Sequence, residues 1–276
     1  MAVARAALPA TLFLASAAPP ARGQVAVAPT VIVLAEPERF GALTVENRSA
    51  AAQEVTVEFR FGYPASDSLG NLRMVYDDSA TAARFSMASW VRAFPRRVLL
   101  GPGQRQLVRL TVRPPANLPD GVYWTRLITS SVPQSARVDS VARGITAQIT
   151  FRLQQITTVL YRRGRAETGI EIGALAVRQD SVELQLLVPL KRTGIAPFLG
   201  TVALRVLDPA GRLVQEGTEI TSVYFSLTKR FAVPRARLTP GTYAAEVKAT
   251  AERSDVVPEA LFPMVPVVIR TQFTVP

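Results

Sequence analysis

The stretch ITAQITFRLQQITTVLYRRG, residues 145–164, alternates like a β-strand, but it is unusually long and it changes phase halfway. In its first half the apolar side chains stand at odd positions: Ile145, Ala147, Ile149, Phe151 and Leu153. In its second half the large apolar residues Ile156 and Leu160 stand at even positions. Successive side chains of a strand point to opposite faces, so the two halves present apolar surface to opposite sides. We expect the second half to serve the core of its own domain and the first half to serve another surface.

The composition of the chain is that of a folded protein without the usual catalytic side chains. It has 276 residues, of which 48% are hydrophobic, so it can form one large or two modest domains. It contains no cysteine and no histidine. Disulfide frameworks, thiolate nucleophiles, charge-relay hydrolysis and the usual zinc sites are thereby excluded. We expect no cofactor and no metal site.

The net charge of +11 raises the question of a nucleic-acid partner. Lysine occurs only at Lys191, Lys229 and Lys248, so arginine supplies nearly all the positive charge, and it is scattered along the chain between acidic residues. Nucleic-acid-binding proteins gather their basic residues on one face and interleave aromatic ones. We therefore expect no nucleic-acid partner, although the charge is compatible with residual affinity for anionic surfaces.

The amino terminus has the pattern of an export signal. Arg5 supplies the positive charge, and the apolar run AALPATLFLASAA, residues 6–18, is too short to cross a bilayer. A proline pair and the small residues Ala21 and Gly23 follow. We expect residues 1–23 to be a signal peptide, the mature chain to be periplasmic, and no membrane span to remain after cleavage.

The rest of the chain alternates with period two in short segments separated by proline, glycine, asparagine and aspartate. Regular short strands of this kind predict an antiparallel sandwich. The pattern restarts after the charged stretch 162–169, and each half contains a turn followed by a tyrosine, Tyr123 or Tyr243. A tyrosine at that place is typical of immunoglobulin-like sandwiches. We expect an all-β fold of two immunoglobulin-like β-sandwich domains, residues 24–163 and 164–276.

Two patterns are similar to catalytic motifs. Ser226 and Lys229 have serine–lysine acyl-enzyme spacing, but the stretch VYFSLTKRF alternates like a strand and the companion motifs are missing. Asp77 and Asp78 form an acidic pair, which in a polar loop is usually a solvated turn rather than a hydrolase or calcium site. We therefore expect that the protein is not an enzyme.

Three stretches of the first half resemble the amino-terminal domain of periplasmic pilus-assembly chaperones. LLGPGQRQLVRLTV resembles a strand pair joined by a Pro-Gly turn, Pro102 and Gly103, with an arginine, Arg109, in the next strand. LPDGVYWTRLITSSVP resembles the family's Leu-Pro-x-Gly-x-Tyr strand, which leads into a variable loop, here 132–144. QITFRL followed by VLYRRG is similar to the family's long last strand. The order and spacing of these stretches across residues 26–164 carry the resemblance, and the second half resembles only another β-sandwich.

The resemblance implies strand donation, in which the last strand lends alternate apolar side chains to an incomplete subunit. The positions that match the donor motif are Ala147, Ile149, Phe151 and Leu153, with Ile145 continuing the row. It also implies that Arg162 lies at the domain junction in a buried ion pair. The family anchors the terminal carboxylate of its subunit with an arginine and a lysine, but their places hold Val31 and Thr158, which cannot pair with a carboxylate.

Two hypotheses about function follow. The first is a periplasmic chaperone-like protein that binds pilin-like, fimbrial or secreted subunits by β-strand donation, with an outer-membrane usher as a further partner that the resemblance implies. The second is a non-catalytic structural or adhesive immunoglobulin-like envelope protein, in which the row 145–153 closes the core of its own domain. Exposure of Ile149 and Phe151 at a sheet edge favours the first hypothesis, and burial of both favours the second.

Export is expected to remove residues 1–23, because the apolar run and the small residues before Gln24 form a signal-peptidase site. Amino-terminal sequencing of the exported protein should find Gln24 first. An exported protein that still begins with Met1 contradicts this prediction.

Overall fold

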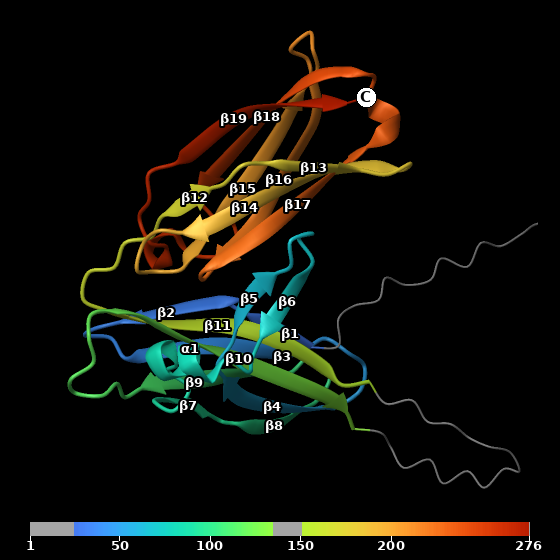
Figure 1. Cartoon of the computed structure of the whole chain (residues 1–276). Helices are drawn as coiled ribbons and strands as arrows, with labels where there is room; N and C mark the ends of the chain where they lie inside the picture. The colour runs from blue at the N-terminus through green and yellow to red at the C-terminus, as the bar shows by residue number, and fades with distance from the viewer. Residues whose placement is uncertain (1–24, 135–150, 276) are drawn as a thin grey trace, which may run out of the picture.

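The computed structural model describes residues 25–134 and 151–275, which form two β-sandwiches, one above the other in Figure 1. The prediction of an all-β protein with two immunoglobulin-like sandwiches is confirmed. The predicted signal peptide, residues 1–23, and the donor positions Ile145, Ala147 and Ile149 lie outside the described residues.

The first sandwich consists of two sheets and a separate hairpin. One sheet contains, in spatial order, β1 (Val25–Ala28), β3 (Phe40–Asn47), β9 (Arg105–Val112) and β7 (Val91–Phe94). The other contains β2 (Val31–Ala35), β11 (Leu153–Arg163), β10 (Gly121–Pro133), β4 (Gln53–Arg60) and β8 (Arg97–Leu100). Every pair in these sheets is antiparallel except β2 with β11, which is parallel. Among the described strands, only β2 pairs with the outer edge of β11.

The second sandwich has the same two-layer construction. One sheet places β14 (Glu183–Arg192) between β17 (Ser226–Pro234) on one edge and both β12 (Ile170–Ile172) and β13 (Ala176–Gln179) on the other. The other sheet contains, in spatial order, β16 (Leu213–Val223), β15 (Phe198–Leu207), β18 (Gly241–Thr250) and β19 (Val267–Val275). Short 3₁₀ turns, η1 (Arg235–Arg237) and η2 (Pro258–Ala260), stand before β18 and before β19.

The two predicted tyrosine corners are present. The Tyr123 hydroxyl donates to the carbonyl of Pro119 at 2.9 Å, and the Tyr243 hydroxyl donates to the carbonyl of Thr239 at 3.0 Å. Each bond joins a tyrosine at the start of a strand to the backbone four residues earlier, which fixes the entry of the chain into that strand. The tyrosines therefore play the same role in both sandwiches.

The segment between β4 and β7, which the sequence indicated only as a long polar loop, is partly ordered. It contains the hairpin β5 (Tyr63–Ser66) and β6 (Leu72–Val75) and the helix α1 (Ser79–Phe85). A helix of seven residues spans about two turns, which is too short to show helical periodicity in the sequence. Within the described residues no helix is long and apolar enough to cross a membrane.

The hairpin β5–β6 belongs to the first sandwich by sequence, but it lies against the second. In Figure 1 it rises from the lower sandwich to reach β17. The backbone N–H of Thr228 in β17 donates to the Ser66 hydroxyl at 2.6 Å. Gly70 at the hairpin tip has a φ of +77° and approaches Arg230 so closely that a Cβ would collide with it. The hairpin therefore links the two sandwiches at a second place, away from the chain connection.

The main contact between the sandwiches is an apolar cluster centred on Trp124 of β10. The Trp124 ring lies 4.9 Å from Phe85 and 4.8 Å from Tyr224 of the second sandwich, measured between ring centroids. Its indole N–H donates to the carbonyl of Gly62 at 3.2 Å. The other buried members of the cluster come from both sandwiches: Val31, Phe61, Val122, Leu160, Ala166, Ala196, Leu199, Val256 and Phe262. Burial of this much apolar surface holds the two sandwiches in one relative orientation.

Trp124→Ala is expected to lower the free energy of unfolding by about 3–5 kcal/mol, because a fully buried aromatic is replaced by a cavity between the sandwiches. Urea unfolding followed by circular dichroism measures the change. Phe94→Ala, which removes an exposed aromatic, is the control and should cost less than about 0.5 kcal/mol. Equal losses in the two variants would show that the cluster does not hold the sandwiches together.

Candidate functional site

The outer edge of β11 is open along the first half of the strand. β11 pairs with β10 along its whole length, from Leu153 opposite Ser131 to Arg163 opposite Gly121. On the other side it pairs with β2 only from Thr158 to Arg162. Between Leu153 and Thr157, therefore, no strand of the described chain occupies the outer edge. An open strand edge offers unpaired main-chain groups to an added strand.

The register shows which main-chain groups face the open edge. The N–H of Thr158 points outward, because it donates to the carbonyl of Thr30 at 2.9 Å just before β2 begins. Main-chain groups along a strand point alternately to the two sides, so those of Gln154 and Ile156 point outward as well. These two residues would supply the hydrogen bonds of an added strand.

We expected the even-numbered apolar residues in the second half of residues 145–164 to serve the core of the first sandwich, and this prediction is wrong. The core of the first sandwich is served by odd positions, because the fully buried Val159 and Tyr161 belong to it. The even-numbered Leu160 is buried in the cluster between the sandwiches, and Ile156 is exposed. The second half of β11 is thus buried on both faces, by its own core on one and by the second sandwich on the other. The backbone alternates without a break, and the change of phase in the sequence reflects this second buried face.

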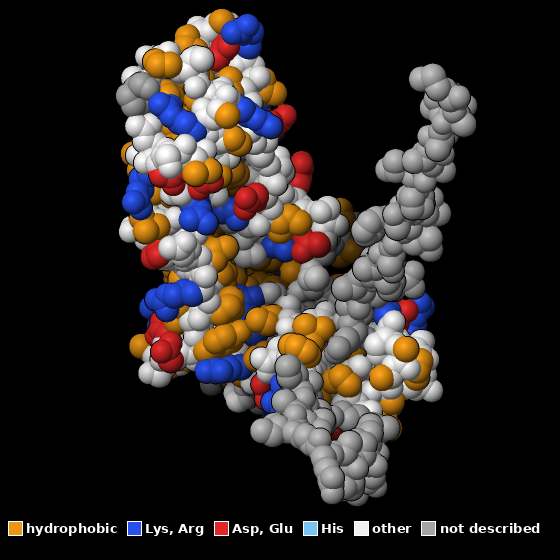
Figure 2. All heavy atoms as spheres, turned by 90° about the vertical axis from the view of Figure 1, so that its right-hand side faces the viewer, with side chains coloured by type: hydrophobic (Ala, Val, Ile, Leu, Met, Phe, Trp, Pro, Cys, Tyr) orange, Lys and Arg blue, Asp and Glu red, His pale blue; other side chains and the backbone are white. Residues whose placement is uncertain are grey.

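The odd-numbered row leaves the core toward the start of β11. Leu153, at the first position of the strand, is 36% exposed, and Phe151, two residues earlier, is 69% exposed. An exposed phenylalanine beside an open strand edge is an apolar surface without a partner in the described chain. Figure 2, which faces this end of the molecule, shows hydrophobic side chains on the surface of the first sandwich among charged side chains of both signs.

The two positions at which the resembled chaperone family has its carboxylate anchor are neighbours in the structure, but here their side chains carry no charge. Val31 and Thr158 are register partners in the parallel pair β2–β11. Val31 is buried in the cluster between the sandwiches, and the Thr158 hydroxyl accepts a hydrogen bond from Nη1 of Arg126. The register therefore places Val31 and Thr158 side by side on neighbouring strands.

Arg126 is a site residue that the sequence pattern did not predict. It projects from β10 toward the second sandwich, where its guanidinium lies 4.7 Å from the ring centroid of Tyr224. Its Nε donates to the carbonyl of Gly62 at 2.9 Å, while Nη2 is buried without a hydrogen-bond partner. One feature of the sequence could have pointed to Arg126. It is a charged residue between Trp124 and Ile128, two apolar residues on the same face of β10.

Arg162 lies near the domain junction but not in the buried ion pair that the resemblance implies. It is half-buried, its register partners are Ala35 and Val122, and the described residues provide no acidic partner for it. The chain turns into the second sandwich just beyond it at Gly164, which has a φ of +64° and contacts Asp120 where a Cβ would collide. Glycine is required at this junction because other residues disfavour that backbone conformation.

The two patterns similar to catalytic motifs have structural roles. Asp78 caps α1: its Oδ1 accepts from the N–H of Thr81 at 2.9 Å, and its Oδ2 accepts from the Tyr63 hydroxyl at 2.7 Å. Hydrogen bonds from Thr81 and then Tyr63 hold the pKa of Asp78 below its ordinary value. Ser226 and Lys229 lie on strand β17, and Lys229 forms an ion pair with Glu219. Among residues 25–134 and 151–275, no three acidic side chains gather as metal ligands.

Comparison with known proteins finds similar structures but no similar sequence. No protein-family model matches the chain, and neither does any curated protein. The crystal structure of the YadV chaperone is 9% identical, covers 92% of this chain and 100% of its own, and has a TM-score of 0.43. A chain of the Salmonella enterica SafA pilin–SafB chaperone complex is 13% identical, with 89% and 95% covered and a TM-score of 0.43. A chain of the CsuC–CsuE chaperone–tip subunit complex from Acinetobacter baumannii is 14% identical, with 90% and 98% covered and a TM-score of 0.42. Similarities at identities and TM-scores this low do not show what this chain binds.

Arg126 is expected to stabilise the fold through its volume and stacking more than through its charge. Arg126→Ala should cost about 2–4 kcal/mol of unfolding free energy, because it opens a cavity against Tyr224 and leaves the Gly62 carbonyl with one donor fewer. Arg126→Met fills the same space and removes a buried charge that has no acidic partner, so it should cost less than about 1.5 kcal/mol. Urea titration of both variants checks this, and equal losses would mean that the hydrogen bonds of the guanidinium dominate.

Proposed function

We propose that this chain is a periplasmic chaperone-like protein that binds fimbrial or secreted subunits by donating its last strand of the first domain. The donor row consists of Ala147, Ile149, Phe151 and Leu153. Main-chain groups of the open edge give affinity in this mode of binding, and the alternating apolar side chains give specificity by filling a groove of the subunit. Arg162 and Gly164 stand at the proposed boundary between domains 24–163 and 164–276.

The observation that carries the proposal is the combination of an open edge with an exposed apolar row on one strand. Phe151 and Leu153 are exposed at the end of β11 where β2 does not reach. Exposing them to water costs free energy that only a partner could recover, since about 25 cal/mol is gained for each Å² of apolar surface buried. The exposure of Phe151 is the arrangement expected of a donor strand, and it argues against a row that closes the core of its own domain.

Further aspects of the proposal follow from the same reading. The partner is a pilin-like or secreted subunit that lacks a strand, and an outer-membrane usher is the second partner. The proposed protein is not an enzyme: Asp78 of the acidic pair caps a helix, and Ser226 and Lys229 lie on a strand. It requires no cofactor.

The test is Phe151→Asp, with Phe94→Asp as the matched control. Both residues are exposed phenylalanines of the first domain, and Phe94 lies in the opposite sheet. Subunits are first identified by co-purification from the periplasm, and their binding to each purified variant is then measured. Phe151→Asp should melt like the unmodified protein, because water solvates the new carboxylate. Its affinity for the subunit should fall at least about 100-fold, because binding buries an unpaired charge at a cost of several kcal/mol.

Phe94→Asp should retain both the melting temperature and the affinity. A Phe151→Asp protein that melts far below the unmodified chain would place Phe151 in the domain core and refute the proposal. Unchanged subunit binding by a stable Phe151→Asp protein would refute it equally.

A further inference from the structure

The open edge of β11 ends at a defined group of residues. From Thr158 onward β2 occupies the edge, and the backbone bond between Thr158 and Thr30 marks the transition. Any strand added beside Leu153–Thr157 would therefore have its end next to Thr30. What surrounds Thr30 determines which kind of chain can be accepted there.

The second sandwich covers this place with the segment between β18 and β19. Val256 and Phe262 of that segment are buried, and they belong to the same cluster as Val31 and Leu160 of the first sandwich. Apolar side chains of the second sandwich thus pack in one cluster with Val31, the residue that follows Thr30.

The ionised group that is hydrogen-bonded to Thr30 belongs to the same covering segment. The Thr30 hydroxyl donates to Oδ2 of Asp255 at 2.9 Å. Arg253 holds Asp255 from the other side, with Nε 2.8 Å from Oδ1 and Nη2 2.6 Å from Oδ2. The hydrogen bond from Arg253 lowers the pKa of Asp255, so this carboxyl is ionised at neutral pH.

Of the two charges, the carboxylate is the more accessible. The Asp255 side chain is 29% exposed, whereas that of Arg253 is 7% exposed and also donates to the Ser222 hydroxyl at 2.8 Å. Arg126, the neighbouring cation, is buried beneath Tyr224. A second carboxylate placed beside Thr30 would therefore meet a negative charge, and the guanidinium of Arg253 is already paired with Asp255.

We propose that the open edge of β11 accepts an internal extended segment of its partner and does not recognise a terminal carboxylate. This inference rests on the proposed strand donation and adds the class of ligand. The chain of the segment continues past Thr30 into solvent, because Asp255 disfavours a carboxylate placed there.

The test uses two fluorescein-labelled peptides of the same sequence, in which valine alternates with threonine and serine. One peptide ends in a free carboxylate and the other in a carboxamide. Their affinities for the full chain are compared by fluorescence anisotropy. The unmodified protein should bind the carboxamide peptide at least about threefold more tightly than the free-acid peptide, because the free carboxylate meets the negative charge of Asp255.

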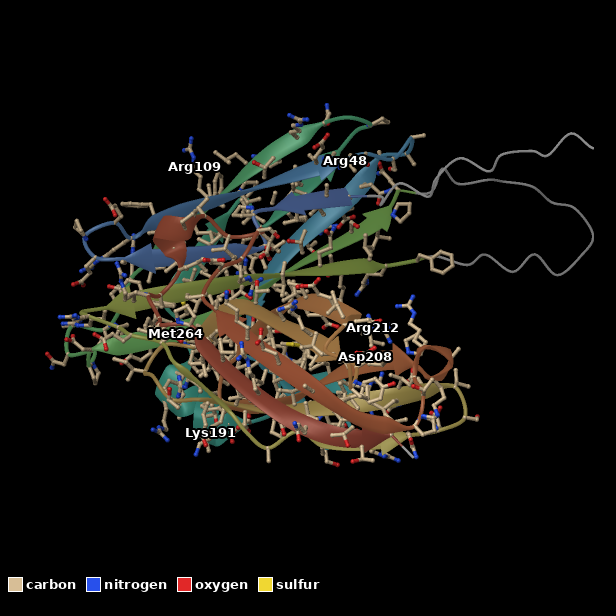
Figure 3. The ribbon with its side chains drawn as sticks, turned by 90° about the horizontal axis from the view of Figure 1, so that it is seen from above. Arg48, Arg109, Lys191, Asp208, Arg212 and Met264 are labelled. Carbon is tan, nitrogen blue, oxygen red and sulfur yellow. The ribbon has the colours of Figure 1, made fainter. Side chains whose placement is uncertain are left out.

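Two variants make the comparison specific. Asp255→Asn frees the guanidinium of Arg253, so it should bind the free-acid peptide at least about fivefold more tightly than the amide. Asp208→Asn is the matched control: Asp208 binds Arg212 at 2.8 Å in the turn between β15 and β16 (Figure 3), and its replacement should leave the ratio unchanged. Thermal melting confirms that both variants are folded.

Equal binding of the two peptides by the unmodified protein, or a preference for the free-acid peptide, would overturn the inference and leave strand donation intact. An Asp255→Asn protein that keeps the preference for the carboxamide would overturn the role of Asp255. If neither peptide binds the unmodified chain, the open edge does not accept an extended segment and this inference is contradicted, whereas strand donation is tested by the Phe151→Asp comparison.

Discussion

The fold depends on the burial of one pair of strands on both of their faces. β10 is buried along nearly its whole length, and β11 is buried along its second half. One face of this pair packs into the core of the first sandwich, through residues such as Leu127 and Tyr161. The other face carries Trp124 and Leu160 into the cluster between the sandwiches. The pair is therefore a central layer, and the position of every other element is defined relative to it.

The same layer determines where a partner can bind. Where the second sandwich covers β11, both faces and both edges of the strand are occupied, and nothing further can be added. The covering stops short of Leu153, and there the strand keeps an open edge and an exposed apolar side chain. The open edge is thus the part of the central layer that neither β2 nor the second sandwich reaches. The two ends of the open edge differ: exposed Phe151 lies next to one end, and Thr30, which is hydrogen-bonded to Asp255, lies next to the other.

Burial of the Arg126 guanidinium in the central layer is unfavourable in free energy. The guanidinium receives two hydrogen-bond acceptors and an aromatic face, but no carboxylate, and one of its nitrogens has no partner. Removing a cation from water without an opposite charge is unfavourable. The packing of Tyr224 against it and the apolar contacts around Trp124 offset this cost. A buried arginine in this place also keeps the hydroxyl of Thr158 hydrogen-bonded.

The sequence alone determined the local elements. Alternation with period two predicted the strands, and the tyrosines predicted both corners. These features depend on neighbours a few residues apart, so a sequence displays them directly. The turn at Pro102–Gly103 joins β8 to β9, which lie in different sheets, so the strand pair that the resemblance implied there is wrong. The tertiary structure decided which faces of the strands are buried. Ile156 and Leu160 share one face of β11, yet only Leu160 is covered, because the second sandwich lies over one and stops before the other. The contacts of Arg126, Asp255 and the hairpin β5–β6 likewise join residues distant in the chain, and no local pattern encodes such distances.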